Sequence, residues 1–286
     1  MPIEVRNVSL TYGEGTPFET HALKNVSFTI EDGEFVGVMG HTGCGKSTML
    51  QLVDGLLSPT EGEILLDGED INAKRYDRSG LREAVGYVFQ YPECQLFETT
   101  VEKDVAFGLK HSRLSKDEIA MRVRWALEAV GFDYEKVRGK SPLGFSGGEK
   151  RRIAIAGILA AKPRFLLLDE PIAGLDPLGR GAFMKLLRKL NAEGTTIIMV
   201  SHNADSIGEC CRRVLVFDNG ELVENGATAE VFEDVRKMRS RHIGVSQSRE
   251  IAFLLKEKGT DFPQRISCYG ELLHAVIGEL KGGEPQ

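Results

Sequence analysis

The sequence lacks any long uninterrupted apolar run. A helix that crosses a bilayer needs about 18 or more mostly apolar residues, and no stretch of the 286 residues supplies them. The N-terminus, MPIEVRNVSL, alternates apolar and polar residues, so it predicts a strand and not a signal peptide. We therefore expect no membrane span, and we expect any membrane association to run through a partner.

Cysteine is also scarce. The five cysteines are odd in number and form no CxxC pair; they are Cys44, Cys94, Cys210, Cys211 and Cys268. A disulfide scaffold or a zinc site needs a different spacing, so the sequence predicts neither. The pattern is typical of reduced thiols in a cytosolic protein.

Basic residues are in the minority, with 36 lysines and arginines against 42 acidic residues and a net charge of −6. Binding to nucleic-acid phosphates requires a basic surface, so we expect no nucleic-acid partner. One basic cluster does occur, at Arg236, Lys237, Arg239 and Arg241. We interpret it as a solvated linker face, with a local nucleic-acid patch as the alternative.

The apolar residues that are present follow the pattern of an α/β fold. Residues 3–12 and 26–30 alternate as strands do, and Phe35–Met39 is a short buried-type strand. Further strands of this type are predicted at Phe165–Leu168, Thr196–Val200 and Val214–Phe217. Helical stretches separate them, which is typical of a largely parallel sheet covered by helices.

Charged amphipathic helices are predicted between about residues 70 and 140 and again after Phe232. Ser115 and Glu118 form a capping-box signature at the start of one of them. Trp125 lies off the apolar face of that helix, so we interpret it as a partly buried packing residue. In the tail, apolar residues at 251–255 and 272–280 predict two more helices.

The strongest chemical signal is a glycine-rich loop that satisfies GxxxxGK[ST] between a strand and a helix. Glycines let the backbone turn its N–H groups toward phosphate, and the helix N-terminus adds positive charge. We expect Lys46 to reach the β- and γ-phosphates and the Ser47 hydroxyl to bind Mg²⁺. The expected ATP contacts in this loop are Gly40, His41, Thr42, Gly43, Cys44, Gly45, Lys46, Ser47 and Thr48.

A pair of carboxylates complements this loop. Asp169 and Glu170 end the apolar strand that begins at Phe165. Successive side chains at a strand end point in different directions, so the two residues can have two roles. We expect Asp169 to hold Mg²⁺ and Glu170 to orient or deprotonate the attacking water.

A third motif, Ser146-Gly147-Gly148-Glu149, begins a predicted helix and so forms a second phosphate-binding helix end. Alone it is a weak loop motif. Because it precedes the strand that ends in Asp169-Glu170, the sequence resembles ATP-binding cassette proteins, whose signature motif it matches. In that family the signature contacts the ATP of the partner subunit.

The resemblance implies roles for four more residues. Tyr12 matches the aromatic residue that stacks on adenine, and Gln90 matches the glutamine that contacts Mg²⁺ and senses the γ-phosphate. Asp176 matches the loop that joins the two active sites of a dimer. His202 matches the switch histidine that contacts the γ-phosphate.

Two further stretches narrow the resemblance to energy-coupling factor transporters. Val88–Phe97 contains FQYPECQLF, and Thr100–Gly108 reads TVEKDVAFG. The segments Thr16–Glu19, Gly40–Gly43 and Lys281–Gly283 resemble the second of the two ATPase paralogues in that family. Three residues depart from the usual pattern, namely Phe145 for Leu, Glu149 for Gln and Ile172 for Thr, and none of them removes a phosphate ligand.

The resemblance implies an α/β P-loop fold of the cassette type, with an antiparallel β subdomain, a helical subdomain and a C-terminal helical extension. We expect the cassette domain at residues 1–232, its helical subdomain at about 74–160, and the extension at 233–286 as a contact between ATPases. The implied function is that of an ATP-binding and ATP-hydrolysing subunit, with Mg²⁺, that powers uptake of a vitamin or transition-metal ion.

The implied partners are the paralogous ATPase in a heterodimer, a transmembrane coupling protein, and a membrane substrate-binding protein, with this chain peripheral at the cytoplasmic face of the membrane. The coupling protein is expected to dock near Tyr91–Phe97. Glu93 is a candidate partner for its arginine, with a solvated loop charge as the alternative. A clamp acting on DNA or ribosomes is disfavoured by the single P-loop and the absence of heptads. The FQYPECQLF stretch disfavours another alternative, the ATPase of an ordinary importer that works with a separate soluble binding protein.

Overall fold

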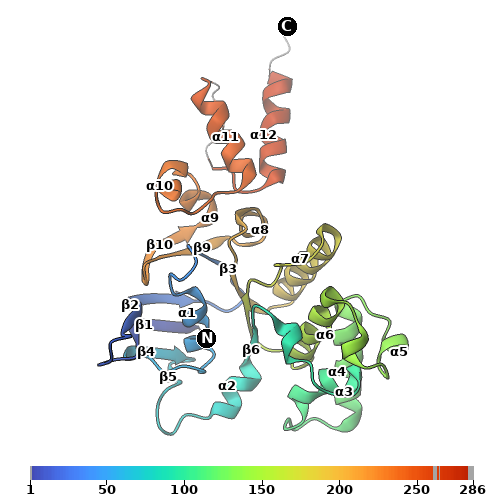
Figure 1. Cartoon of the computed structure of the whole chain (residues 1–286). Helices are drawn as coiled ribbons and strands as arrows, with labels where there is room; N and C mark the ends of the chain where they lie inside the picture. The colour runs from blue at the N-terminus through green and yellow to red at the C-terminus, as the bar shows by residue number, and fades with distance from the viewer. Residues whose placement is uncertain (1, 260–262, 264, 283–286) are drawn as a thin grey trace. The chain divides into compact units, whose positions relative to one another are not determined.

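The computed structural model describes residues 2–259, 263 and 265–282, with side chains described up to residue 278. Two compact units make up the chain: the described parts of residues 1–76 and 198–286 form the first, and residues 77–197 form the second. Figure 1 shows their helices and strands. Gly283, the end of the predicted Lys281–Gly283 segment, lies outside the described residues, as does the rest of the predicted extension beyond it.

The first unit begins with a four-stranded antiparallel sheet in the order β2-β1-β4-β5. Its strands are β1 (Ile3–Tyr12), β2 (Thr20–Ile30), β4 (Glu61–Leu66) and β5 (Glu69–Asp70). Ile3, Val5, Val8 and Leu10 of β1 are buried, because alternate side chains of a strand face the same side of a sheet, whereas Tyr12 at its end is exposed. The strand prediction for residues 3–12 is therefore confirmed.

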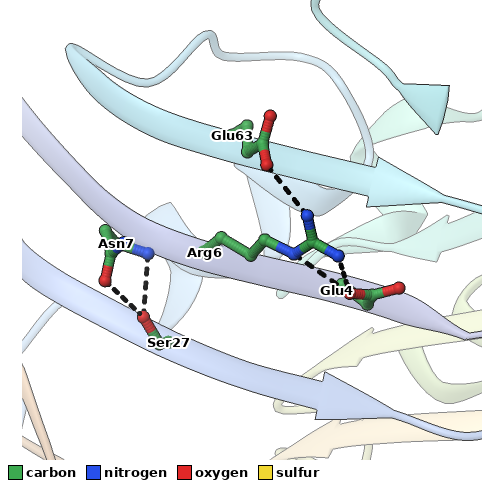
Figure 2. A network of polar contacts seen from close by, with 5 residues as sticks. All are labelled: Glu4, Arg6, Asn7, Ser27 and Glu63. Atoms are coloured by element: carbon green, nitrogen blue, oxygen red, sulfur yellow. Dashed lines mark hydrogen bonds and ion pairs between the residues drawn. The ribbon is translucent and has the colours of Figure 1, made fainter. Parts of the chain in front are cut away.

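A bulge in β1 explains why its apolar pattern alternates imperfectly. Asn7 has a φ of 48°, and the register against β2 shifts around it. The Asn7 N–H donates to Ser27 Oγ over 2.8 Å, and that hydroxyl donates back to Asn7 Oδ1 over 3.1 Å (Figure 2). Next to it, Arg6 pairs with Glu4 of its own strand and with Glu63 of β4. These contacts join three strands at the point where the alternation slips.

A second set of strands in the first unit leads to the phosphate-binding loop. The strands β3 (Phe35–Met39), β9 (Arg213–Asp218) and β10 (Glu221–Ala227) lie in the order β10-β9-β3, with β9 parallel to β3 and antiparallel to β10. Every residue of β3 is buried. The helices α1 (Lys46–Val53) and α8 (Ala204–Cys210) belong to the same unit. Buried strands of this kind correspond to the continuous apolar runs from which the sequence predicted strands.

Four helices follow in the C-terminal part of the first unit. They are α9 (Thr228–Val231), α10 (Val235–Ser240), α11 (Gln247–Glu257) and α12 (Tyr269–Gly282). In Figure 1, α11 and α12 lie side by side, and their contact is built around buried Ala252 and Leu272 together with Ile266. Buried Arg249 donates to the carbonyls of Phe232 and Glu233 and so ties α11 to the end of α9. The two helices predicted in the tail are confirmed.

The basic cluster after Phe232 lies on a helix and not on a linker, although three of its four side chains are exposed as the interpretation of a solvated face expects. Its residues lie on α10 and in the turn after it, and each of them pairs with a glutamate. Arg236 pairs with Glu257, Arg239 with Glu250, and both Lys237 and Arg241 with Glu224. The glutamates come from other elements, so the local sequence did not reveal them. Their charge opposes the accumulation of positive potential that a nucleic-acid patch needs.

The second unit is mostly helical around two parallel strands. Its elements are α2 (Arg78–Ala84), β6 (Val85–Val88), η1 (Pro92–Gln95), α3 (Val101–Ala106), η2 (Phe107–Leu109), α4 (Lys116–Ala129), α5 (Tyr134–Val137), η3 (Pro142–Gly144), α6 (Gly147–Ala160), β7 (Phe165–Asp169) and α7 (Pro177–Ala192). The strands β6 and β7 are parallel neighbours, with Val88 opposite Leu168. Helix α6 packs against α3 and α4. The strand β8 (Thr196–Val200) carries the chain from this unit back to the first.

Several local predictions can be compared with these elements. The capping box of Ser115 and Glu118 is present at the start of α4, and Trp125 is half-buried, so both predictions are confirmed. The five cysteines are free thiols. Within the described ranges, no helix is long and apolar enough to cross a membrane.

Candidate functional site

The glycine-rich loop Gly40–Ser47 joins β3 to α1 in the first unit. Gly40 has a φ of 149°, and a Cβ there would lie 2.4 Å from the carbonyl oxygen of Phe217. Gly45 has a φ of 101°, and a Cβ there would lie 2.5 Å from the carbonyl oxygen of Ala22. Only glycine fits both positions without strain. The first and last glycines of the motif are therefore required by the backbone of the loop.

Lys46 places its ammonium inside this loop. Its Nζ donates to the carbonyls of Gly40 and His41, each over 2.8 Å, and lies 3.6 Å from Cys44 Sγ. Helix α1 begins at Lys46, and its N-cap residue is Gly45. Among the described residues, no side chain makes a capping hydrogen bond at this helix end. The first N–H groups of a helix have no acceptor inside it, so this end combines a cation with outward-pointing donors. That combination suits a polyphosphate.

Three neighbours complete the loop. The hydroxyl of Tyr12, at the end of β1, lies 3.3 Å from Thr48 Oγ1, and Tyr12 remains 42% exposed. The ring of Tyr12 is therefore accessible beside α1, as stacking on a base requires. His41 Nε2 lies 3.3 Å from Asp218 Oδ1 at the end of β9. Burial raises the pKa of the Cys44 thiol, which keeps that side chain neutral within the loop.

His202 lies in the first unit, between β8 and α8, and its side chain is exposed. Both of its neighbours are anchored. The Ser201 N–H donates to the carbonyl of Val38 in β3 over 3.1 Å, and Asn203 caps α8 by accepting from the Ser206 N–H over 2.9 Å. This segment therefore holds His202 in place from both sides.

The two predicted carboxylates lie at the end of β7 in the second unit, and both are buried. The Tyr87 hydroxyl donates to Asp169 Oδ2 over 3.4 Å, a contact that joins β6 to β7. Glu170 has a φ of 50°, which is uncommon for a residue other than glycine. Such a conformation is held by its surroundings and is frequent at functional sites. Gln90 follows β6 with its side chain exposed.

The signature motif caps its own helix. Ser146 is the N-cap residue of α6, and the Glu149 N–H donates to its hydroxyl oxygen over 3.4 Å. The Ser146 N–H and hydroxyl donate to Glu149 Oε2 over 2.9 and 2.7 Å. These bonds lower the pKa of the Glu149 carboxyl below its ordinary value, so it is ionised at neutral pH. Open space faces Gly147 and Gly148, because a Cβ on either would meet nothing within 4 Å.

The structure brings the signature motif and the predicted dimer loop to one hollow of about 350 Å³. Asp176 caps α7 by accepting from the Gly179 N–H over 2.9 Å, which lowers the pKa of its carboxyl. Leu178, on the same rim, is 87% exposed. A hollow edged by a helix N-terminus and an exposed leucine suits contact with a second protein that carries an anion.

The predicted site residues are divided between the two units. The first unit holds Tyr12, the Gly40–Thr48 loop and His202, and the second holds Gln90, Ser146–Glu149, Asp169, Glu170 and Asp176. Among the described residues no three His, Cys, Asp or Glu side chains form a metal cluster. The predicted ligands Ser47, Gln90 and Asp169 offer a hydroxyl, an amide carbonyl and a carboxylate. Such hard oxygen donors fit Mg²⁺, which also keeps waters and substrate phosphates as ligands.

Sequence reasoning missed two residues that contact the predicted site. Tyr87 binds Asp169, and Arg151 binds the backbone carbonyls of Gln90 and Glu170. The only signal for Arg151 was its place among the basic residues after the signature motif. Glu93 also differs from one expectation, because its Oε2 is buried, so the alternative of a solvated loop charge is wrong.

Comparison with known proteins identifies the family. A protein-family model described as ABC transporter matches residues 23–173. The energy-coupling factor transporter ATP-binding protein EcfA2 of Clostridium perfringens is 45% identical over 97% of this chain and 98% of its own length. EcfA2 of Caldanaerobacter subterraneus is 43% identical over 99% of both chains. EcfA2 of Streptococcus thermophilus is 44% identical over 97% of this chain and 99% of its own.

Two solved structures are also similar. The structure of cbiO1 from Clostridium perfringens, described as part of the ABC transporter complex cbiONQ, has a TM-score of 0.72 and 40% identity; the match covers 84% of this chain and 94% of that one. An ATP-binding cassette solved as a dimer in a post-hydrolysis state, bound to ADP and Pi, has a TM-score of 0.70 and 33% identity. That match covers 79% of this chain and 98% of the other.

Proposed function

We propose that this chain, which belongs to the ABC transporter family as an ATP-binding and ATP-hydrolysing subunit of the energy-coupling factor type, powers the uptake of a micronutrient. The predicted fold class and family are thereby confirmed. The cargo we propose is a vitamin or a transition-metal ion, and the naming of similar proteins as energy-coupling factor subunits and as part of cbiONQ supports this range. The observation that carries the proposal is the loop at Gly40–Ser47 in a chain similar to EcfA2 over nearly its whole length.

In the proposed site, the ATP triphosphate lies on the Gly40–Ser47 loop, with Lys46 on the β- and γ-phosphates. Tyr12 stacks on adenine beside Thr48, consistent with its exposed ring. Because the N-terminus of α1 offers backbone donors and a lysine, this half of the site binds the substrate strongly by itself.

For hydrolysis, a water oxygen attacks the γ-phosphorus while the bond to the β-phosphate oxygen breaks, releasing ADP and phosphate. Glu170 orients this water and accepts its proton, and His202 contacts the γ-phosphate. Ser47, Gln90 and Asp169 would hold Mg²⁺, which would supply positive charge to the phosphate oxygens. The Tyr87 hydroxyl fixes the orientation of Asp169.

We place a partner subunit at the hollow between Ser146–Glu149 and Asp176. Gly147 and Gly148 at the start of α6 border open space, and exposed Leu178 offers apolar contact area. The proposed partner is the paralogous ATPase, whose ATP would reach this signature motif while its own signature reaches the ATP of this chain. Co-expression of both ATPases and native mass measurement test this, and a stable homodimer that ignores the paralogue would contradict it.

The C-terminal extension is proposed to contribute to the same ATPase contact. Ile251 and Leu254 on α11 are each 46% exposed, as is Leu273 on α12. Exposed apolar residues gathered on two packed helices are typical of a surface that a partner covers. The domain limits at 1–232 and 233–286 remain predictions.

The transmembrane coupling protein is proposed to dock at Tyr91–Phe97. Tyr91 and Phe97 are 59% and 62% exposed, and the Phe97 ring packs edge to face on exposed Phe107 with centroids 4.8 Å apart. Charge reversal at Glu93 should weaken assembly while Mg-ATP binding is kept, with Glu93→Gln as the milder control. Normal assembly of the reversed variant would exclude this role for Glu93.

This docking places the chain at the cytoplasmic face of the membrane as a peripheral subunit, and the membrane substrate-binding protein joins through the complex. Substrate choice would then lie outside this chain. Purification of the native complex and mass identification of its bound small molecule test the proposed class of cargo. A bound vitamin or cobalt or nickel ion would support it, whereas a sugar or peptide would contradict it.

A further inference from the structure

Arg151 connects two loops of the second unit through one guanidinium group. It lies in the second turn of α6 and is 4% exposed. Its Nη2 donates to the carbonyl of Glu170 over 2.8 Å and to that of Gln90 over 3.0 Å, and its Nη1 donates to the carbonyl of Ala173. The planar guanidinium fork can direct donors to several acceptors at once. One side chain thus holds together the loop after β6 and the turn after β7, which are far apart in the sequence.

Each of the three carbonyls belongs to a segment with a proposed role in hydrolysis. Gln90 follows β6, and Glu170 follows β7. Ala173 lies in the turn that leads to Asp176. The Glu170 carbonyl accepts a second bond from the Ala173 N–H over 3.2 Å. Two donors therefore fix the peptide that follows Glu170.

The backbone of Glu170 needs such support. Its φ of 50° is unfavourable for a side chain with a Cβ, and such a conformation persists only where neighbouring groups determine it. Arg151 supplies a charged donor to the carbonyl of this residue, and hydrogen bonds from charged groups are stronger than neutral ones. The direction of the Glu170 side chain depends on the backbone that Arg151 holds.

The buried charge of Arg151 has a counter-charge nearby. Burial lowers the pKa of its guanidinium, while Glu93 raises it. Among the described residues, Arg151 Nε and Glu93 Oε2 are buried without a hydrogen-bond partner. Arginine stays protonated in proteins, so Glu93 offsets part of the cost of burying the charge. A buried charge kept at that cost indicates that its geometry matters more than its contribution to stability.

We infer that Arg151 is a positioning residue for hydrolysis, which holds the backbones of Gln90, Glu170 and Ala173 in the one arrangement that aims the Glu170 carboxylate at the attacking water. The inference rests on the proposed roles of Gln90 and Glu170. It adds that the signature helix sets the geometry of the hydrolytic residues of its own chain. Helix α6 packs on η1, and its Arg151 contacts both the carbonyl of Gln90, just before the proposed docking segment, and that of Glu170.

The test uses the full chain in the complex that it forms with its co-purifying subunits, and it measures kcat and KM for ATP and the melting temperature. Arg151→Gln should lower kcat by roughly 10- to 100-fold, the scale of misplacing a catalytic group by a fraction of an ångström to one ångström. The KM should stay within about threefold, because the donors that bind the triphosphate lie on α1. Arg151→Lys keeps the charge but not the fork, so it should restore part of kcat.

Arg122→Gln is the matched control. Arg122 lies on α4 and donates from Nη1 to the carbonyl of Ala161 over 2.9 Å, a residue that belongs to neither of the two loops that Arg151 contacts. Its loss should lower the melting temperature while kcat stays within about twofold of the wild type. A purely structural Arg151 would behave in the same way, so the split between kcat and melting temperature separates the two roles.

A kcat within twofold of the wild type for Arg151→Gln would overturn the inference. So would a kcat loss in Arg122→Gln as large as that in Arg151→Gln. Should Arg151→Gln fail to fold, Arg151→Lys decides: a drop in kcat of threefold or more at constant KM supports positioning, and a smaller drop refutes it. Wild-type turnover in Glu170→Gln would instead overturn the proposed role of Glu170, so the two failures are distinguishable.

Discussion

Helices α1 and α6 each begin at a motif that contains serine and glycine, but different groups lie at their N-terminal ends. Helix α1 has Gly45 as its N-cap, no capping side chain among the described residues, and the Lys46 ammonium within the loop before it. Helix α6 has Ser146 as its N-cap, and the Glu149 carboxylate accepts from both the N–H and the hydroxyl of Ser146. One end is cationic and uncapped; the other is capped by an anion.

The difference teaches how two similar helix ends can divide one task. An N-terminus attracts anions through its N–H groups and dipole. At α1 the lysine adds to this attraction, so the loop binds a triphosphate within a single chain. At α6 an incoming phosphate meets the Glu149 carboxylate and competes with it for the Ser146 hydroxyl. We therefore expect the signature end to bind phosphate weakly alone and, in the proposed ATPase dimer, to contribute when the partner brings its nucleotide.

The largest predicted effect separates binding at these two ends from hydrolysis. Glu170→Gln should lower ATP turnover by about 10²-fold or more, the contribution of a general base, while ATP binding is retained. Neither helix end changes in this variant, so affinity should not fall. Steady-state turnover and ATP titration measure the two quantities. Glu193→Gln removes an exposed carboxylate and serves as the control; wild-type turnover in Glu170→Gln would refute the role.

A paired substitution tests the division between the two ends directly. Lys46→Ala should weaken ATP binding by roughly 10- to 100-fold, since it removes charge-assisted bonds worth about 1.5–3 kcal/mol. Ser146→Ala should leave the ATP affinity of the purified chain unchanged but lower the turnover of the assembled ATPase. Nucleotide titration of the chain and turnover of the complex give the two readouts.

The control for this pair is Lys185→Ala, which removes an exposed lysine of α7. It should change neither quantity. If Ser146→Ala weakened ATP binding in the purified chain as much as Lys46→Ala, the two helix ends would not be divided as described.

A second pair compares glycines at the two ends. Gly40→Ala should destabilise the fold by about 1–3 kcal/mol or more, because of the positive φ and the Cβ contact with the Phe217 carbonyl. Gly147→Ala should leave the melting temperature unchanged or slightly raised, since its Cβ meets open space and alanine favours a helix. Thermal unfolding of both variants measures this. A large loss of stability in Gly147→Ala would contradict the open signature end.

The features predicted from the sequence are those encoded over short distances. Strands such as β1 and β3 follow from apolar periodicity, and the Gly40–Ser47 loop from fixed glycine spacing between a strand and a helix. The capping box at Ser115 was recognised from the same rule. Ser146 and Glu149 have the same spacing and also form a capping box. Only a phosphate-binding helix end was predicted at these residues from the sequence.

The features missed depend on contacts that folding creates between distant residues. Arg151 reaches the carbonyl of Gln90 across 61 positions, and Tyr87 reaches Asp169 across 82. Neither backbone carbonyls nor a tyrosine hydroxyl leave a motif in the sequence. The ion pairs of the basic cluster on α10 were missed for the same reason, since Glu224 lies on β10.

The smallest predicted effect concerns the anion at the signature end. Glu149→Gln keeps an oxygen that can accept from Ser146 but removes the negative charge beside the incoming phosphate. We expect the ATP concentration for half-maximal turnover of the assembled ATPase to fall by about two- to fivefold, corresponding to roughly 0.4–1 kcal/mol. The measurement is a turnover titration of both proteins at the same salt concentration, because screening weakens the effect.

The pH dependence of stability provides the control for this last comparison. The hydrogen bonds from Ser146 lower the pKa of Glu149 below its ordinary value of 4.5, so the folded state favours the ionised form. The stabilisation is complete above pH 4.5 and is lost as the pH falls through the folded-state pKa. Wild-type protein should therefore lose more stability than Glu149→Gln on acidification below pH 4.5. Two results together would contradict this comparison: a parallel loss of stability in the wild type and Glu149→Gln, and equal half-maximal ATP concentrations for the two proteins. The Glu149 carboxylate would then not account for the difference between the N-terminal ends of α6 and α1.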